Sequence, residues 1–392
     1  GGCREERWYE PSYEDPAAPR LPAAQLAGPF RERLRAATPL RLRAGVPVGA
    51  YPSGGIDSSA IVAAVARWFR DTRLSTFSIR FDEKSFDEGS YQQELARHLG
   101  TDHHEVLCRS RDIAEIFPRV VEHTECPVLR TAPAPMFLLS RLVRRSGYKV
   151  VLTGEGADEM LGGYDIFREA KIRTFWARFP ESPARPHLLR RLYPWMSERS
   201  PSRRLGFAKA FFGKGIEAPG HPAFSHIPRW ESAARLLGLL SAEAKEASAG
   251  HDPPALLEPF LPAGFHRSGW LARAQALEVA TILSGYILSS QGDRMLMGNS
   301  VEGRFPFLDP EMMAFAGRLP RGAKIRGLDE KHLLKRAMAE HLPRAILERP
   351  KQPYRAPDAL CFFQEGAPEW VEELLAPAAI GRAGIFDPRA VA

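Results

Sequence analysis

Cysteines are scarce in this sequence, and long apolar runs are absent. The cysteines lie far apart and no two form a C-x-x-C pair, which argues against a zinc ribbon and a disulfide scaffold. No apolar stretch approaches the roughly 20 residues that a membrane-spanning helix needs. A signal peptide is not recognisable, so we expect a cytoplasmic protein with no membrane partner. The cysteines are Cys3, Cys108, Cys126 and Cys361.

Acidic residues are outnumbered by basic ones. The 392 residues include 54 Lys and Arg against 47 Asp and Glu, a formal net charge of +7. A basic balance raises the question of nucleic-acid binding. Much of the excess lies in two arginine-rich stretches, 31–43 and 185–204, in which Leu, Trp and Phe recur at intervals suited to packing. We interpret these stretches mainly as solvated helix faces and expect no nucleic-acid partner.

A short glycine loop, Ser53–Ser59, stands between an apolar run, Val46–Tyr51, and a helix expected to begin near Ala60. Two adjacent glycines let the backbone fold tightly and expose its amides. The helix adds its unpaired N-terminal amides and the positive end of its dipole at the same place. The loop therefore predicts a phosphate cradle, with a helix-capping polar turn as the alternative. Hydroxyl donors would come from Ser53, Ser58 and Ser59.

Asp57 lies inside this loop and restricts the kind of ligand that the loop can bind. A carboxylate among phosphate-binding amides would repel the ligand unless a divalent cation bridges the two, so we expect Asp57 to bind Mg2+. The Walker pattern G-x-x-x-x-G-K-[ST] is absent, because no lysine follows the glycines. This absence argues against an ordinary kinase or GTPase cradle and favours chemistry at the α-phosphate of ATP.

Four stretches, in the same order along the chain, carry a resemblance to one family. The glycine loop resembles the PP-loop of ATP pyrophosphatases, which adenylate a substrate and release pyrophosphate. Three further stretches resemble motifs of the synthetase domain of glutamine-hydrolysing asparagine synthetases. Together the four matches cover the chain from about Arg31 to Pro357. The three further stretches are Val151–Tyr164, Ser289–Asp309 and Lys331–Gln352.

Alternating strand and helix patterns predict an α/β fold, and the resemblance implies the same. We expect a parallel twisted sheet with helices on both faces, followed by a mainly helical C-terminal part. Ligands of such sheets bind at the carboxyl ends of the strands, so the loop at Ser53 and the motif at Thr153 should meet in one crevice. The expected strands are Val46–Tyr51, Leu74–Phe81, His104–Leu107 and Tyr148–Thr153. The expected helices are Ala60–Phe69, Glu88–Leu99, Arg111–His123 and Ala134–Arg145.

The resemblance also divides the chain into four segments. Residues 1–28 would be a linker from a missing N-terminal glutaminase domain, and 29–164 the nucleotide-binding core. Residues 165–265 would form a mainly helical excursion, and 266–392 a helical part that completes the synthetase site. Cys3 is not the terminal residue and no glutaminase domain follows it, so ammonia would come from a domain outside this chain. A homo-oligomer is compatible with the sequence.

Each residue of the nucleotide site acquires a role from the resemblance. Asp57 and Asp158 match the carboxylates that hold Mg2+ in the family, an arrangement that suits a hard cation bridging phosphates. Ile79 matches a residue that packs on or bonds the adenine of ATP, although such an isoleucine more often simply belongs to the core. Thr153 and Gly154 would touch the nucleoside through backbone atoms. The pyrophosphate would be held by Ser53, Gly54, Gly55, Ser58 and Ser59.

Two more residues match the family's catalytic chemistry. Glu155 resembles the glutamate that receives a proton from attacking ammonia. Lys351 matches a lysine that neutralises charge on the α-phosphate, whereas a lone lysine is more often a surface charge. Four further residues are candidates for the substrate pocket, because two acids and two arginines can pair there. They are Asp293, Arg294, Glu302 and Arg304.

The predicted reaction is adenylation of the aspartate β-carboxylate by MgATP, followed by attack of ammonia to give asparagine, AMP and pyrophosphate. Two departures from the family pattern leave alternatives. Pro52 has no N–H to donate to a nucleotide, and Leu129–Pro133 differs from the aspartate-binding pattern. The main alternative is an amidotransferase or cyclase acting on another carboxylate in specialised or cell-surface metabolism. Minor alternatives are an inactive nucleotide-binding scaffold and a tRNA-modifying PP-loop enzyme.

Overall fold

The computed structural model describes residues 3–4, 6–19, 21–69, 74–193, 201–364 and 366–391. The chain forms two compact units, each built from two separate stretches of sequence. Unit 1 comprises Gly1–Tyr164 and Pro262–Pro357, and unit 2 comprises Asp165–Leu261 and Asp358–Ala392. The four sequence-based segments stay a prediction. Among the helices of the described ranges, none is both long enough and apolar enough to cross a membrane.

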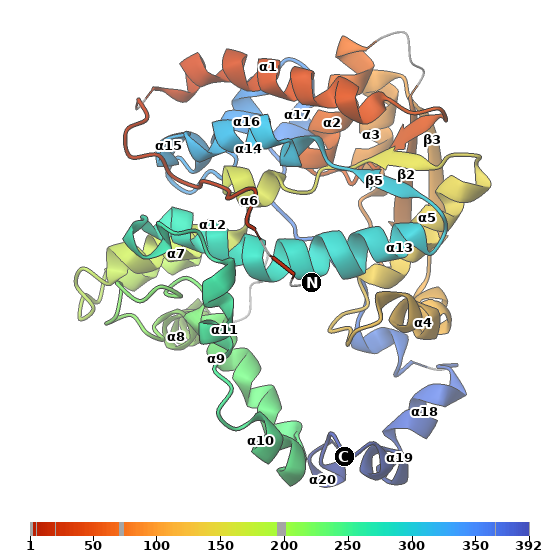
Figure 1. Cartoon of the computed structure of the whole chain (residues 1–392), viewed down its shortest axis with the longest axis vertical. Coiled ribbons are helices and arrows are strands. Elements are labelled where there is room, and N and C mark those ends of the chain that lie inside the picture. Colours follow the sequence, from red (N-terminus) through yellow and green to blue (C-terminus); the bar gives the residue numbers. More distant parts are fainter. Residues whose placement is uncertain are drawn as a thin grey trace. The chain divides into compact units, whose positions relative to one another are not determined.

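A parallel β-sheet forms the centre of unit 1 (Figure 1). In the part of the chain that the structure describes, its five strands lie in the order β3-β2-β1-β4-β5, and every neighbouring pair is parallel. Four of the strands correspond to predicted ones. The fifth, β5, is short and rich in charge and was not predicted. The bounds are β1 Val48–Ala50, β2 Ser75–Phe81, β3 Asp102–Cys108, β4 Val150–Leu152 and β5 Glu302–Arg304.

The strand order reverses between β1 and β4. The chain builds β1, β2 and β3 outward in one direction and then returns to place β4 on the other side of β1. Gly49 pairs with Val151, and Ala50 with Leu152. Loops that leave the carboxyl ends of two such strands diverge and open a ligand-binding crevice. The glycine loop after β1 and the motif after β4 leave the sheet at this place, as the sequence predicted.

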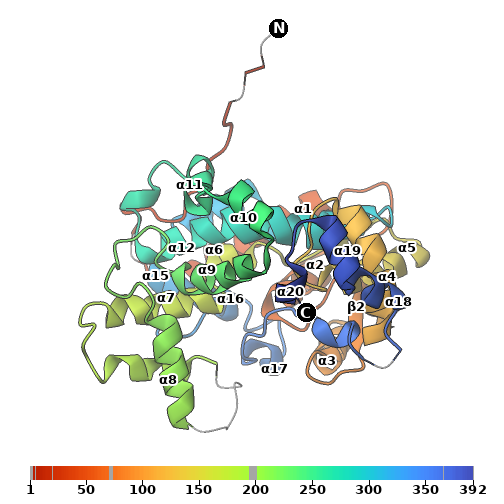
Figure 2. The same cartoon turned by 90° about the horizontal axis from the view of Figure 1, so that it is seen from below.

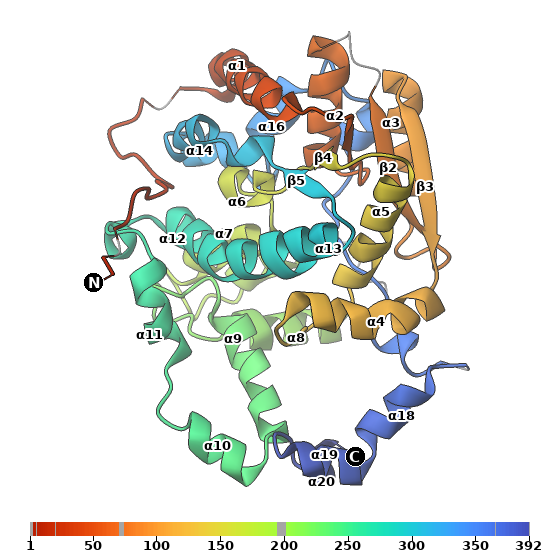
Figure 3. The same cartoon turned by 45° about the vertical axis from the view of Figure 1, so that its right-hand side comes forward.

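Helices cover both faces of the sheet, which confirms the predicted fold class. Figure 3 shows α2 (Ile56–Trp68) and α3 (Gly89–Leu99) together on one side of the strands and α5 (Pro133–Arg145) on the other. The start of α2 near Ala60 was wrong by about a turn. Gly54 has φ 72°, and this left-handed turn lets the helix begin directly after Gly55. Asp57 and the two serines after it therefore lie in the first turn of the helix.

The remaining helices of unit 1 pack around this core. Helix α1 (Ala23–Leu42) begins inside the stretch expected to be a linker, and it buries Phe30 and Leu34 completely. A continuous rod runs from α12 (Trp270–Glu278) through the π-helix η5 (Val279–Asp293) into α13 (Arg294–Met297), as Figure 1 shows. The others are α4 Ser110–Thr124, α6 Ala157–Leu161, α14 Pro310–Gly317, α15 Arg321–Lys324, α16 His332–Ala337 and α17 Arg344–Leu347.

Unit 2 is helical in its described residues, and one buried arginine organises part of it. Arg173, on α7 (Asp165–Trp176), donates from Nε to the carbonyl of Phe212 in α8 (Pro201–Phe212) at 2.8 Å. Figure 2 shows these two helices next to each other. The other helices of this unit are α9 Ile227–Ala233, α10 Ala242–Ser248, α11 Pro253–Leu257, α18 Glu369–Leu375, α19 Pro377–Ala383 and α20 Pro388–Val391.

Candidate active site

The glycine loop closes on its own serine side chains. Ser58 Oγ accepts a hydrogen bond from the Ser53 amide at 2.9 Å and lies 2.9 Å from Ser53 Oγ. Ser53 Oγ also accepts from the Gly55 amide at 3.3 Å. These contacts fold the loop back over the first turn of α2. Its amides and the N-terminal amides of α2 thus lie together at the carboxyl edge of the sheet, where a phosphate group can bind.

The motif after β4 packs directly against this loop. A Cβ atom on Gly154 would lie 2.6 Å from the amide nitrogen of Ser58 and 2.9 Å from the carbonyl carbon of Asp57. Only glycine allows two backbones to approach so closely. Three residues later α6 begins, and its first turn carries Asp158 toward Asp57. The absence of a side chain at one position therefore brings two carboxylates together.

Two aspartates and two lysines meet at this junction. The Lys331 ammonium group pairs with Asp57 Oδ2 and lies 2.7 Å from Asp158 Oδ1. Lys351 Nζ donates to Asp158 Oδ2 at 2.6 Å. We call Asp57, Asp158, Lys331 and Lys351 the lysine–aspartate quartet. Lys331 is only 1% exposed, and its backbone has φ 49°, a left-handed conformation that places it just before α16.

Burial and charge pairing act in opposite directions on the quartet. Burial disfavours the charged form of Asp158, but Lys331 and Lys351 outweigh it and hold the pKa at about 2. Burial also opposes the charge on Lys331, yet the two carboxylates raise its pKa above the ordinary lysine value. Burial raises the pKa of Asp57, and Lys331 is the main influence against that rise. Asp158 and Lys331 are therefore ionised at neutral pH.

Two glutamates beside the quartet hold protons more firmly than usual. Burial is the main cause of the raised pKa of Glu155, and the charges of Asp57 and Asp158 add to it. Burial likewise raises the pKa of Glu159 to about 8. The Tyr164 hydroxyl donates to Glu159 Oε1 at 2.7 Å. A carboxyl group with a raised pKa is better matched to proton transfer near neutral pH.

The oxygen donors at this junction fit a hard divalent cation. Asp57 Oδ1 is buried and has no hydrogen-bond partner among the described residues. Magnesium is commonly held by one or two carboxylates, with water and substrate phosphates as its other ligands. Asp57 and Asp158 would supply those two carboxylates. No group of three or more His, Cys, Asp or Glu side chains able to hold a metal occurs in the described ranges.

Comparison with family models decides the classification of the chain. The asparagine synthase model matches residues 29–392. The chain belongs to the asparagine synthase family. The resemblance inferred from the four motifs is thereby confirmed, and the observed α/β architecture agrees with it.

Individual relatives are similar over most of this chain. A Mycobacterium tuberculosis protein provisionally named glutamine-hydrolysing asparagine synthetase is 35% identical, over 81% of this chain and 46% of its own length. Asparagine synthetase 1 of Bacillus subtilis is 26% identical over 90% of this chain and 52% of its own length. Amidase chyE of Penicillium rubens is 29% identical over 83% and 52%. The chain thus spans about half the length of these relatives.

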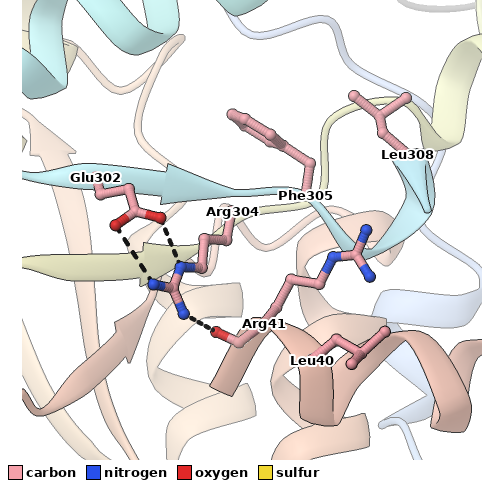
Figure 4. A pocket seen from close by; sticks show the side chains of 6 residues that line it. All are labelled: Leu40, Arg41, Glu302, Arg304, Phe305 and Leu308. Carbon is pink, nitrogen blue, oxygen red and sulfur yellow. Dashed lines mark hydrogen bonds and ion pairs between the residues drawn. The ribbon is translucent and has the colours of Figure 1, made fainter. Parts of the chain in front are cut away.

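Arg304 pairs with Glu302 and also bonds to the C-terminal end of α1. Arg304 donates from Nε to Glu302 at 2.7 Å and from Nη1 to the carbonyls of Arg41 and Arg43 at 2.9 and 2.8 Å. With a further bond from Nη2 to Glu302, four of its five N–H donors are engaged. Figure 4 shows both side chains at a pocket of about 310 Å³, which is lined by Leu40, Arg41, Glu302, Arg304, Phe305 and Leu308.

The other two pocket candidates have different surroundings. Arg294 pairs with Glu125 and donates to the carbonyl of His123 at 3.4 Å. Burial raises the pKa of Asp293, and the charge of Glu302 adds to that rise. The two arginines of the predicted pocket therefore have separate partners in the structure. A substrate-binding role for any of the four residues stays a prediction.

Ile79 and Lys351 were predicted site residues, whereas Lys331 was not. Ile79 is buried in β2, and its carbonyl accepts a hydrogen bond from Gln92 at 3.2 Å. Sequence reasoning placed Lys351 in the site, and the structure pairs it with Asp158. The same reasoning quoted Lys331 at the start of the fourth motif but gave it no role. Its position at the start of a family motif could have indicated a role in the site. The sequence alone did not distinguish it from the nearby lysines.

Proposed function

We propose that this chain adenylates a carboxylate with ATP and passes the acyl group to ammonia, and that aspartate is the acceptor. The observation that carries the proposal is the lysine–aspartate quartet at the junction of the glycine loop and the β4 motif. Such a junction binds the phosphates of a nucleotide on backbone amides and places a lysine beside them. The names of the relatives support the same chemistry.

In the adenylation step, a carboxylate oxygen of the acceptor attacks the α-phosphorus of ATP, and the bond to pyrophosphate breaks. Lys351 neutralises the negative charge that grows on the α-phosphate and on the leaving group. Lys331 keeps the Asp57 and Asp158 carboxylates at one place beside the loop. Magnesium, held by these two aspartates when bound, would supply further charge neutralisation. The loop amides and the serine hydroxyls orient the pyrophosphate.

In the amide-forming step, ammonia attacks the acyl carbon, AMP leaves, and one proton of the attacking nitrogen must be removed. Glu155 would accept that proton, since it lies three residues after the end of β4, where the charges of Asp57 and Asp158 reach it. Its Oε2 atom is buried and has no hydrogen-bond partner in the described part of the chain. Burial raises its pKa, so it holds the proton more readily than an exposed glutamate. A glutaminase domain outside this chain would supply the ammonia.

A second acceptor class has its own support. Leu129, in the stretch that departs from the aspartate-binding pattern, is 88% exposed. Thr131 instead turns inward, and its hydroxyl donates to the carbonyl of Pro357 at 2.8 Å. Relatives named as amidases are as similar to this chain as some of those named as asparagine synthetases. Another carboxylic acid is therefore the alternative acceptor.

Substrate-dependent exchange of labelled pyrophosphate into ATP tests the proposal. The chain is incubated with ATP, Mg2+ and a panel of carboxylic acids, and AMP release is then measured with ammonia. Exchange that depends on aspartate supports the proposed function, and exchange with another acid selects the alternative. An intact chain that binds ATP but exchanges pyrophosphate with no acid would contradict the adenylation.

The Glu155→Gln variant separates the two steps. We expect pyrophosphate exchange to persist within about threefold, while amide formation falls about 100-fold, because general-base catalysis typically contributes on this scale. Rapid-quench measurement of both steps in one preparation gives the comparison. An equal loss in both steps would show that Glu155 acts before ammonia attacks.

A further inference from the structure

Lys351 lies on a segment that has no helix or strand of its own. Residues 349–357 follow α17 as irregular backbone. A lysine side chain has four rotatable bonds and loses much conformational freedom when it is fixed. The 2.6 Å contact between Lys351 Nζ and Asp158 Oδ2 therefore needs the backbone around it to be held in place. We call residues 349–357 the strap. The structure shows contacts that attach the strap at both of its ends.

The first attachment is the side chain of Arg349. Its Nη2 atom lies 2.5 Å from Glu88 Oε1, and its guanidinium group stacks over the ring of Tyr91, 4.2 Å from the centroid. The Arg349 side chain is only 8% exposed. Glu88 precedes α3 directly, and Tyr91 lies in the first turn of that helix. Arg349 thus fixes the start of the strap to a regular element of the nucleotide-binding core.

Arg349 also reaches the glycine loop. A Cβ atom on Gly54 would lie 2.8 Å from Tyr91 Cβ and 3.0 Å from Arg349 Nη1. Glycine is required here for its positive φ and for this close approach. The guanidinium group therefore lies against the backbone of the loop, and one side chain touches both the loop and α3. Lys351 follows two residues later on the same irregular segment.

The second attachment is at the other end of the strap. Thr131 is buried, and its hydroxyl donates to the carbonyl of Pro357 at 2.8 Å. The Tyr354 hydroxyl donates to the carbonyl of Ala132 at 3.4 Å. These bonds join the strap to the residues just before α5. Lys351 thus lies between two anchored ends, and the stronger set of contacts is at Arg349.

We propose that Arg349 is a positioning residue: by clamping the strap to Glu88 and Tyr91 it holds the Lys351 ammonium group beside Asp158. The inference rests on the proposed function, in which Lys351 acts on the α-phosphate. It assigns Arg349 no contact with substrate. An arginine suits this task because its planar guanidinium group can pair with a carboxylate and stack on a ring at once, which lysine cannot do.

A double-mutant cycle tests the clamp. Arg349→Met should lower kcat for pyrophosphate exchange about 10- to 100-fold, because small misplacements of a catalytic group have effects of this size. The KM for ATP should change by less than about twofold. In the Lys351→Met background, Arg349→Met should have no further effect on kcat, since it acts only through Lys351. Glu88→Gln, which keeps the shape of the partner, should reproduce a milder form of the defect.

A second readout does not depend on activity. Limited acetylation with acetic anhydride, followed by peptide mass spectrometry, measures how accessible Lys351 is. Acetylation of Lys351 should increase severalfold in Arg349→Met and stay unchanged in Arg344→Met. Arg344 is the matched control, because it pairs with Glu348 on the exposed surface of the preceding helix. Arg349→Lys should restore little, since lysine cannot stack and pair together.

Three outcomes would overturn the clamp. One is a multiplicative loss in the double variant, and another is a raised KM for ATP with unchanged kcat, which would mean direct contact with phosphate. The third is unchanged acetylation of Lys351 in both Arg349→Met and Glu88→Gln. If the wild-type chain exchanges pyrophosphate with no acid, the proposed function fails. The acetylation result then still decides whether Arg349 positions Lys351.

Discussion

At the scale of single residues, the site depends on how buried charges are balanced. Lys331 is the residue that joins Asp57 to Asp158, and it is almost completely buried. Breaking a buried ion pair by removing one partner is costly, because the other charge remains without compensation. Removal of this lysine would leave two carboxylates facing each other, so its effect should reach both stability and activity.

Lys331→Met should lower the free energy of unfolding at pH 7 by about 3 kcal/mol. This loss of stability should become smaller as pH falls toward 5. Without the lysine, the pKa values of the facing carboxylates rise, and one carboxylate then takes up a proton in the folded variant. Urea denaturation at both pH values gives the measurement. Lys335→Met is the control, since Lys335 on α16 also pairs with two acids, Asp329 and Glu330, which lie just before that helix, in a less buried setting. Equal stability of the two variants would contradict the central role of Lys331.

Residue identity predicted which side chains would meet wherever a motif constrains the backbone, and the roles of these side chains stay predictions. Asp57, Asp158 and Lys351 were found because glycines or a family motif surround them, and the structure brings the three together. Arg349 was quoted in the same motif as Lys351 but received no role, because its partners lie some 260 positions earlier in the chain. A contact between such distant positions depends on the fold, which one sequence does not reveal.

At the scale of elements, helix α6 is held by a buried polar chain. Gln275 Nε2 donates to the carbonyl of Met160 at 3.0 Å and also to that of Glu159, at the C-terminal end of α6. Lys324 Nζ donates to Gln275 Oε1 at 3.1 Å and to the carbonyl of Tyr13 at 3.0 Å. Three separate stretches of sequence thus fix the short helix that carries Asp158. Sequence patterns gave no sign of this series of buried hydrogen bonds, because each residue in it alone resembles an ordinary surface residue.

Lys324 should make stability depend on pH above neutrality. Burial lowers its pKa from 10.5 to about 7, so the unfolded chain binds more protons than the folded one between these values. The free energy of unfolding should therefore rise with pH from about 7 to about 10 by a few kcal/mol relative to Lys324→Met. Below pH 7 the two curves should run parallel, since the amine is then charged in both states. Urea titrations of both proteins across this range test the sign, and parallel curves above pH 7 would refute it.

At the scale of the whole molecule, elements that are distant in the sequence lie in one compact unit, which patterns read along the sequence do not predict. The predicted strands of the sheet lie in the first half of the sequence, and their alternation with helices was sufficient to predict the fold class. Strand β5, in the third motif, joins that sheet beside β4 from about 150 positions later. Its three residues, Glu302–Arg304, have no strand pattern of their own. They pair because the edge of β4 and the capping of α1 by Arg304 hold them there.

Each unit has its own buried core, so a defect in unit 2 should be local. Arg173 donates to three backbone carbonyls of unit 2, including that of Phe212, and stacks over Phe224 at 4.1 Å. Arg173→Met should lower the stability of unit 2 by about 3 kcal/mol, since buried carbonyls lose a charged donor. Hydrogen exchange with mass spectrometry should show weaker protection in unit 2 and an unchanged response of the glycine loop to ATP. A uniform loss of protection in both units would oppose this expectation.

The equal numbers of positive and negative charges in the quartet affect which ions this junction can attract. Two ammonium groups face two carboxylates, so the resting junction has no surplus charge with which to attract a lone anion or a lone cation. Inorganic phosphate would have to separate a lysine from its aspartate without compensating that aspartate. A nucleotide that arrives with its cation offers both signs at once and can replace both halves of the pairing. Under the proposed function, the quartet would therefore favour the nucleotide together with its cation over either small ion alone.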